Sequence, residues 1–66
     1  MKEAATLIVR DTDSLEEAVA IVRYDDSRVA LCLSLHSHGD VEIVMRMADA
    51  KRLIEALQKA TNPRMR

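Results

Sequence analysis

The chemistry open to this 66-residue chain depends first on its thiol, imidazole and carboxylate side chains. Cys32, His36, His38 and Asp40 form the best group, and their even numbering lets a hairpin project them from one side. Zinc takes these ligand types, but a structural site normally needs four ligands in close tetrahedral array. Same-side neighbours on a strand lie about 7 Å apart, so Cys32 and His38 are too distant for one ion. We therefore expect no metal or other cofactor.

Nucleophilic catalysis is a second use for these residues. A catalytic cysteine needs a neighbouring base, an orienting carboxylate and a pocket, and a short aliphatic chain has little room for a pocket of several hundred cubic ångströms. Gly39 is the only glycine, whereas phosphate-binding loops need more than one. We expect no enzymatic activity and interpret Cys32 as a small residue on a sheet face.

A predicted hairpin positions these side chains. Its first strand alternates Val29, Leu31, Leu33 and Leu35 with smaller or polar residues, and its second alternates Val41, Ile43, Met45 and Met47 with Glu42, Val44 and Arg46. A period of two predicts strands with one buried face. Gly39 lies in the connecting turn, where a hairpin needs a residue with positive φ.

The hydrophobic spacing then changes to that of a helix, which the sequence predicts to end at Asn62 and Pro63. The helical face comprises Ala50, Leu53, Ile54, Leu57 and Ala60. Residues 62–66 are predicted to be a frayed tail.

The segment from Leu15 to Tyr24 fits two structures. Ser14 and Glu17 have the spacing of a helix capping box, but the β-branched residues of 18–24 and the short turn after them favour a strand. With 6–10 as another strand, we expect a single α+β domain over residues 1–66. It is a small antiparallel β-meander of three to four strands with one C-terminal α-helix packed on one face. The alternative order is β-α-β-β-α.

Size and composition restrict the class of protein further. A domain of 66 residues has a thin core, and the lone Cys32 cannot form an internal disulfide, so a second copy or a bound target would supply missing support. The first ten residues lack the pattern of a signal peptide and no apolar run could span a membrane, so we expect a cytoplasmic protein without membrane partners. Tyr24 is the only aromatic residue, which leaves no stacking platform for single-stranded nucleic acid.

The charges are sorted along the chain. Ten acidic residues accompany five basic ones through Asp49, whereas five basic residues accompany one acidic residue from Ala50 onward. In a meander, two of the acidic turns meet at one end of the sheet and would form a predicted acidic rim. Asp25 and Asp26 lie at the other end of the sheet and are also predicted to bind the partner. The predicted rim comprises Asp11, Asp13, Glu16, Glu17, Asp40 and Glu42. Clustered carboxylates can compete with the phosphates of DNA for a basic protein surface. We therefore expect a larger partner with a basic surface.

The basic end of the chain supports a competing hypothesis. A small homodimeric regulatory protein could contact nucleic acid through the basic helix and tail, which carry Lys51, Arg52, Lys59, Arg64 and Arg66. An overall pI near 6.1 is below that of autonomous nucleic-acid-binding domains, so direct binding is not expected. Lys59 also has a structural role in complementing the helix dipole.

The stretch from Arg28 to Ala60, RVALCLSLHSHGDVEIVMRMADAKRLIEALQKA, is similar to the hairpin-plus-helix core of many very small bacterial and phage proteins. With its small size and acidic turns, the chain resembles anti-CRISPR proteins, which phages and mobile elements encode. Several of those proteins bind the DNA-recognition surface of a CRISPR effector complex with acidic residues. The resemblance implies a non-enzymatic protein-binding inhibitor that mimics DNA.

Overall fold

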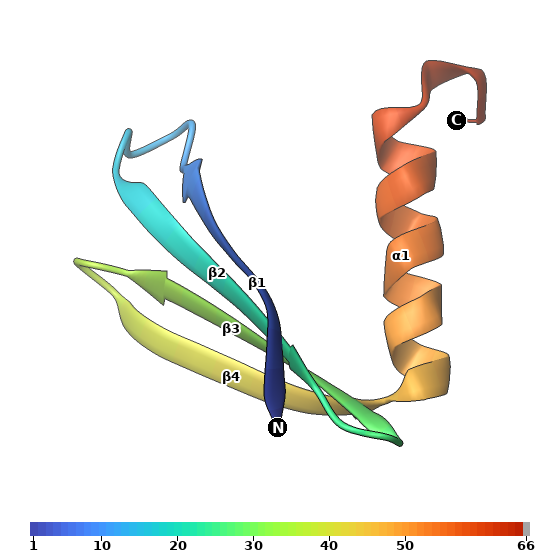
Figure 1. The fold of residues 1–66 in the computed structure, drawn as a ribbon. Coiled ribbons are helices and arrows are strands. Elements are labelled where there is room, and N and C mark those ends of the chain that lie inside the picture. Colours follow the sequence, from blue (N-terminus) through green and yellow to red (C-terminus); the bar gives the residue numbers. More distant parts are fainter. Residues whose placement is uncertain (66) are drawn as a thin grey trace.

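The computed structural model describes residues 1–65, which form a four-stranded antiparallel meander followed by one helix (Figure 1). The elements are β1 (Lys2–Arg10), β2 (Glu17–Tyr24), β3 (Arg28–Leu35), β4 (Gly39–Arg46), α1 (Met47–Thr61) and a 3₁₀ turn, η1 (Pro63–Met65). The predicted α+β fold is confirmed. Glu17–Tyr24 is a strand, so the alternative order is not needed. Arg66, part of the predicted frayed tail, lies outside the described residues.

The strand register separates two faces of the sheet. Leu7, Ala20, Leu33 and Val41 oppose one another across the four strands and therefore share one face. We call this the apolar face; its residues are Ala5, Leu7, Val9, Ala18, Ala20, Val22, Tyr24, Val29, Leu31, Leu33, Leu35, Val41, Ile43 and Met45, with Lys2 at its edge opposite Tyr24. The opposite side is the mixed face, with Ile8, Arg10, Val19, Ile21, Arg23, Ala30, Cys32, Ser34, Asp40, Glu42, Val44 and Arg46.

Two turns have residues in the left-handed backbone region. Gly39 has φ 76°, as predicted for the hairpin turn between β3 and β4. Leu15, in the turn between β1 and β2, has φ 64°, a conformation that side chains disfavour. Leu15 donates a backbone hydrogen bond to the Asp11 carbonyl at 2.8 Å, so the turn is closed by hydrogen bonding despite this conformation.

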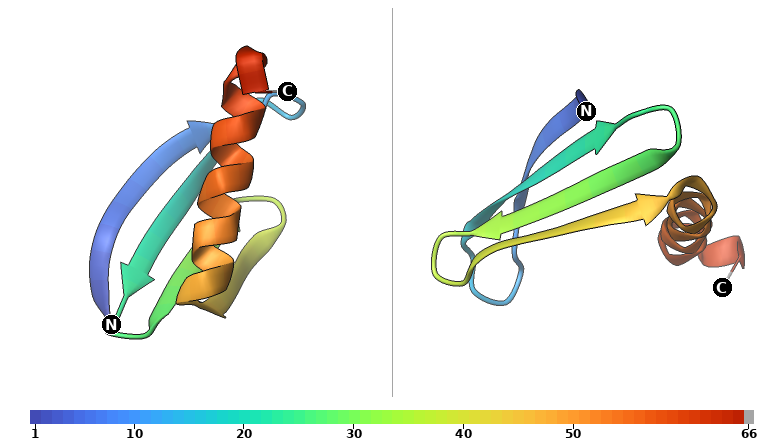
Figure 2. Two further views of the ribbon diagram at one scale, coloured as in Figure 1. Left: turned by 90° about the vertical axis from the view of Figure 1, so that its right-hand side faces the viewer. Right: turned by 90° about the horizontal axis from the view of Figure 1, so that it is seen from below.

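The helix begins directly where β4 ends. Arg46 is the last residue of β4 and the helix N-cap, so no loop separates strand from helix. From this junction α1 and the sheet diverge like the arms of a V, and the helix faces the apolar side (Figures 1 and 2). Within the described residues, α1 contacts only β3 and β4 of the sheet. The predicted helix is therefore present on the predicted face, but it covers much less of that face than we expected.

Very little of this chain is buried. Among the described residues only Ala30 and Ala50 are buried, and the large side chains of both apolar surfaces remain partly open to solvent. Leu7, Val41 and Ile43 on the sheet are 52%, 59% and 56% exposed, and Ile54 and Leu57 on the helix are 53% and 57% exposed. The apolar residues that the sequence assigns to a core thus line an open V.

Candidate functional site

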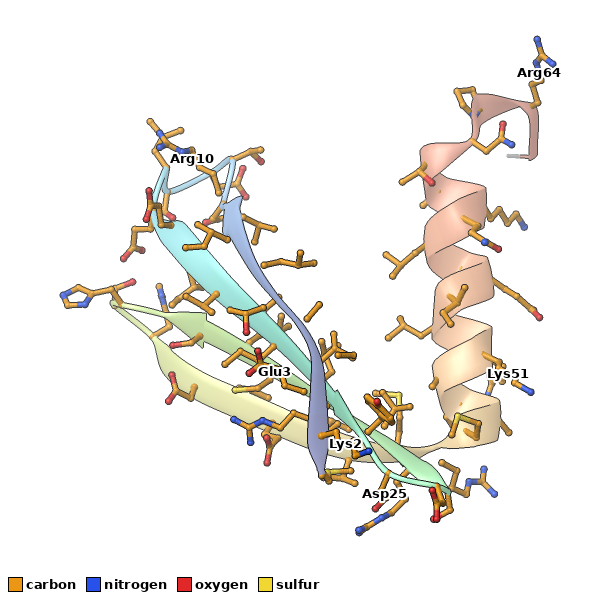
Figure 3. The ribbon with its side chains drawn as sticks, in the orientation of Figure 1. Lys2, Glu3, Arg10, Asp25, Lys51 and Arg64 are labelled. Carbon is orange, nitrogen blue, oxygen red and sulfur yellow. The ribbon has the colours of Figure 1, made fainter. Side chains whose placement is uncertain are left out.

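Acidic side chains gather at the end of the sheet where the β1–β2 and β3–β4 turns meet. We call this group the turn carboxylates: Asp11, Asp13, Glu16, Glu17 and Asp40. Arg10 is the one cation at the ends of these strands and turns, and Figure 3 shows it there, far from Asp25 at the opposite end of the sheet. Five of the six predicted rim residues are therefore brought to one end of the molecule.

Asp11 holds the first turn in place. Its Oδ2 atom accepts hydrogen bonds from the Ser14 hydroxyl at 2.6 Å and the Ser14 amide at 3.2 Å. The hydroxyl bond is the main cause of a lowered pKa for Asp11, since it stabilises the ionised carboxylate. Ser14 therefore supports the turn, and the capping-box helix that its spacing with Glu17 also allowed does not form.

Glu16 joins the two turns. The Ser37 hydroxyl, from the β3–β4 turn, donates a hydrogen bond to Glu16 Oε2 at 2.6 Å, across 21 positions of sequence. This bond lowers the pKa of Glu16. Ser37 Oγ also lies 2.7 Å from His38 Nδ1. A carboxylate of one turn is thus fixed against the other, so the two turns present their charges from one hydrogen-bonded unit.

Asp40 and Glu42, two further predicted binding residues, have local partners. Asp40 accepts a hydrogen bond from the Ser34 hydroxyl. Glu42 lies within β4 opposite Cys32, on the mixed face, and pairs with Arg23 at 3.6 Å, so it stands apart from the turn carboxylates. The turn between β2 and β3 holds Asp25 and Asp26 at the far end of the sheet.

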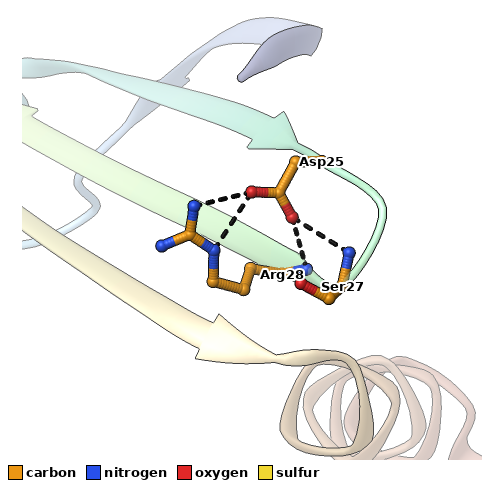
Figure 4. A network of polar contacts seen from close by, with 3 residues as sticks. All are labelled: Asp25, Ser27 and Arg28. Carbon is orange, nitrogen blue, oxygen red and sulfur yellow. Dashed lines mark hydrogen bonds and ion pairs between the residues drawn. The ribbon is translucent and has the colours of Figure 1, made fainter.

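Asp25 organises that far turn (Figure 4). Its Oδ1 accepts backbone hydrogen bonds from Ser27 at 3.0 Å and Arg28 at 2.8 Å, and its Oδ2 receives the Arg28 guanidinium at 3.0 and 2.7 Å. The Ser27 amide and the Arg28 side chain lower the pKa of Asp25 from 3.8 to about 2. A carboxylate with this many partners has a structural role in its turn.

Three predicted binding residues differ from these. In the part of the chain that the structure describes, Asp13, Glu17 and Asp26 make no side-chain hydrogen bond or ion pair. Asp13 and Glu17 belong to the turn carboxylates, where they can accept a new partner without breaking an existing bond.

The group that first suggested chemistry is dispersed. Cys32 is half-buried on the mixed face, whereas His36 and His38 are exposed beside the β3–β4 turn. No three His, Cys, Asp or Glu side chains among residues 1–65 converge as a metal site. His38 instead lies with Asp11 and Gly39 along a hollow of the apolar face.

The basic helix is partly neutralised by its own chain. Asp49 Oδ2 lies 3.2 Å from Arg46 Nε, and Asp49 Oδ1 lies 3.4 Å from Arg52 Nη1. Arg52, one of the predicted basic residues, is therefore already paired with a carboxylate. Asp49 is also in the first helical turn, where a negative charge complements the helix dipole. Figure 3 places Lys51 near the start of the helix and Arg64 beyond its end, so these cations do not form a compact patch.

The apolar face and the facing side of α1 are a second candidate site, which the sequence reasoning missed as an exposed surface. A groove of about 450 Å³ lies between them, with Val22, Leu31 and Met45 on the sheet and Leu53, Ile54 and Leu57 on the helix. A second hollow of about 480 Å³ continues along the same face beside Leu33 and Val41. The available signal was the short distance along the chain between the strand pattern, which reaches Met47, and the helical pattern, which starts at Ala50.

Comparison with protein-family models, curated proteins and solved structures finds no match to this chain. No helix within residues 1–65 is both long enough and apolar enough to cross a bilayer. Function therefore has to be argued from the two surfaces themselves.

Proposed function

We propose that this chain is a non-enzymatic, cytoplasmic inhibitor whose turn carboxylates occupy a basic nucleic-acid-binding surface of a larger protein. It would act as a DNA mimic, in the manner of the anti-CRISPR proteins that it resembles. The observation that carries the proposal is the Ser37–Glu16 hydrogen bond, because it ties the two acidic turns into one unit. A rigid anionic surface loses little conformational entropy when it binds.

Charge density supports this reading. Five carboxylates and one guanidinium lie at this end of the sheet, and hydrogen bonds from Ser14 and Ser37 lower the pKa of Asp11 and Glu16, which favours their ionised forms. Duplex DNA presents one negative charge per about 1.7 Å of axis, so a surface that binds it is rich in Lys and Arg. Such a surface attracts a compact carboxylate cluster, and salt weakens the attraction.

The alternative is a regulatory protein that binds nucleic acid through its C-terminal helix. The Asp49 ion pairs count against it, because Arg52 already has a partner within the helix. Lys51, Lys59 and Arg64 belong to a chain that also carries Glu55 and an acidic sheet, and this negative charge weakens the attraction to phosphate. A gel shift with random duplex DNA tests this alternative directly: retention at modest salt that is lost in Lys51→Ala, Arg52→Ala and Arg64→Ala would favour it over inhibition.

The inhibitor proposal is best tested with the two turn carboxylates that hold no local bond. Asp13→Lys with Glu17→Lys reverses the charge without removing the Asp11 or Glu16 hydrogen bonds. Glu3→Lys with Glu55→Lys makes the same change in net charge on β1 and α1, away from the turns, and is the matched control. Each protein is immobilised to capture partners from a host lysate, and captured complexes are challenged with salt and with duplex DNA.

We expect a partner that the wild type and the control retain, that the Asp13/Glu17 variant loses by tenfold or more, and that duplex DNA displaces. Tenfold corresponds to about 1.4 kcal/mol, which the loss of two or more exposed ion pairs and new repulsion can supply. Equal retention by both charge variants, or a partner that DNA does not displace, would contradict the proposal.

A further inference from the structure

We infer that this chain functions as a two-fold symmetric homodimer in which α1 of each copy lies on the apolar face of the other. This inference is independent of the proposed inhibitor activity, since it concerns the groove between sheet and helix. The occupant is a second copy, and the argument rests on missing burial, on the strand–helix junction and on charge.

The exposed area of the single chain is too large for its mass. Its accessible surface is 5513 Å² at 7.4 kDa, whereas the scaling for folded monomers gives about 4,200 Å². The radius of gyration is 13.2 Å, against about 11 Å for a compact chain of this length. The excess of about 1,300 Å² per chain exceeds the roughly 800 Å² per partner of a standard interface and falls within the range of obligate homodimers.

The exposed side chains are large and apolar, as in the core of a folded protein. Ile54 and Leu57 on the helix and Val41 and Ile43 on the sheet are all more than half exposed, yet they lie on the surfaces that the sequence patterns mark as buried. With only Ala30 and Ala50 buried among the described residues, the chain lacks the apolar burial that a small domain needs. Whatever fills the groove between sheet and helix must therefore be present whenever the protein folds. Another copy of the chain always meets that condition.

The junction explains why one chain cannot close its own groove. Helix–strand connections usually contain about two to six residues, whereas here β4 ends at Arg46 and α1 begins at Met47. Without a loop, the helix leaves the sheet at an angle, and its apolar side stays apart from most of the face it matches (Figures 1 and 2). Short connections of this kind favour exchange of an element between copies.

Charge complementarity favours the same exchange. Residues 1–46 carry nine acidic and five basic side chains, whereas residues 47–64 carry four basic and two acidic ones. The helix of one copy is thus attracted to the sheet of the other. Among the described strand residues, the register places one charged residue on the apolar face: Lys2, opposite Tyr24 at the exposed start of β1. The paired positions along the rest of that face are uncharged, so the dimer buries no unpaired charge over most of it.

The first test is the mass and the unfolding temperature of the pure chain at several concentrations. We expect twice 7.4 kDa by light scattering. A tenfold increase in concentration is equivalent to about 1.4 kcal/mol and should raise the Tm of such a pair by about 5 °C. A folded chain of single mass with a concentration-independent Tm would overturn the inference, as would a chain that folds only when a different protein is added.

Matched substitutions locate the interface. Ile54 is 53% exposed on the helix and faces the groove, whereas Ile8 is 68% exposed on the mixed face. Ile54→Glu should abolish the dimer, while Ile8→Glu should leave its dissociation constant within about threefold of wild type, as for other surface changes. Equal effects of the two substitutions would refute the placement.

A thiol probe covers the case in which Ile54→Glu does not fold. In a Cys32→Ser background, Ile54→Cys should be alkylated by iodoacetamide at least tenfold more slowly than Ile8→Cys, and dilution should remove the difference. Similar rates at high concentration would overturn the inference.

A longer connection between strand and helix is a further test. Four Gly and Ser residues inserted between Arg46 and Met47 should let the helix close on its own sheet and halve the mass. An unchanged dimer mass would contradict the reciprocal placement of α1.

Discussion

Replacing Leu15 by glycine should stabilise the protein by about 0.5 to 1 kcal/mol per chain. Leu15 has φ 64°, and the left-handed region costs an L-residue roughly 1–2 kcal/mol. Glycine removes that cost, but the greater entropy of its unfolded chain lowers the free energy of unfolding by about 0.5–1 kcal/mol. The Leu15 side chain is 66% exposed, so its removal forfeits little burial.

The assay is urea unfolding followed by circular dichroism, with every variant at one protein concentration. With an m-value of about 1 kcal/mol per molar urea, the midpoint should rise by about 0.5 to 1 M for Leu15→Gly. The backbone bond from Leu15 to the Asp11 carbonyl is available to either residue, so the turn should be retained. Leu15→Ala is the control, because it shortens the side chain and keeps the disfavoured φ.

Leu15→Ala should therefore lie within about 0.5 kcal/mol of wild type. A midpoint for Leu15→Gly that is equal to or below that of wild type would refute the reasoning. Equal stabilisation by alanine and glycine would also refute it, since the gain would then come from the side chain and not from the backbone.

Three other substitutions test the turns. Gly39→Ala should cost about 1 kcal/mol, measured by the same urea assay, because its φ of 76° disfavours a side chain even though no atom of residues 1–65 lies within 4 Å of an added Cβ. The pKa of Asp25 is depressed, so its stabilising effect is present above pH 3.8 and is lost as the pH falls toward about 2. The fall in Tm over this pH window should therefore be shallower in Asp25→Asn than in the wild type. Ser37→Ala should raise the pKa of Glu16 toward its ordinary value, observed by NMR titration of the carboxyl carbon, and an unchanged value would contradict the bond between the turns.

The sequence predicts the β3–β4 hairpin and the helix well because both have a clear periodicity. Val29 to Leu35 and Val41 to Met47 alternate, and Leu53, Ile54 and Leu57 repeat at helical spacing, so strand and helix are identified from residue types alone. The strand pattern was wrong only at its last residue, because Met47 begins α1. The segment from Leu15 to Tyr24 is ambiguous because its apolar residues fit a helical face whereas its β-branched residues favour a strand, and the strand is the structure that forms over Glu17–Tyr24. Asn62 and Pro63 correctly marked the end of the helix.

Hydrogen bonds between turns could not be predicted in the same way. The bond from Ser37 to Glu16 depends on how two hairpin ends meet in space, and neither residue type specifies the other across 21 positions. Glu42 was assigned to the acidic rim from its closeness in sequence to Asp40. The alternating pattern places Glu42 within the second strand, but its position opposite Cys32 and its ion pair with Arg23 follow only from the strand register.

The openness of the molecule has a physical origin that composition hides. Hydrophobic content and periodicity state which side chains prefer burial, but not whether the chain can turn sharply enough to bring those side chains together. Here β4 ends at Arg46 and α1 begins at Met47, so no residue is available for a loop and the two apolar surfaces of one chain stay apart. The apolar face and the apolar side of α1 can instead be covered by the corresponding surfaces of a second copy of the chain. The turn carboxylates lie at the opposite end of the sheet from that junction, so the two surfaces are argued from different residues and can be tested separately.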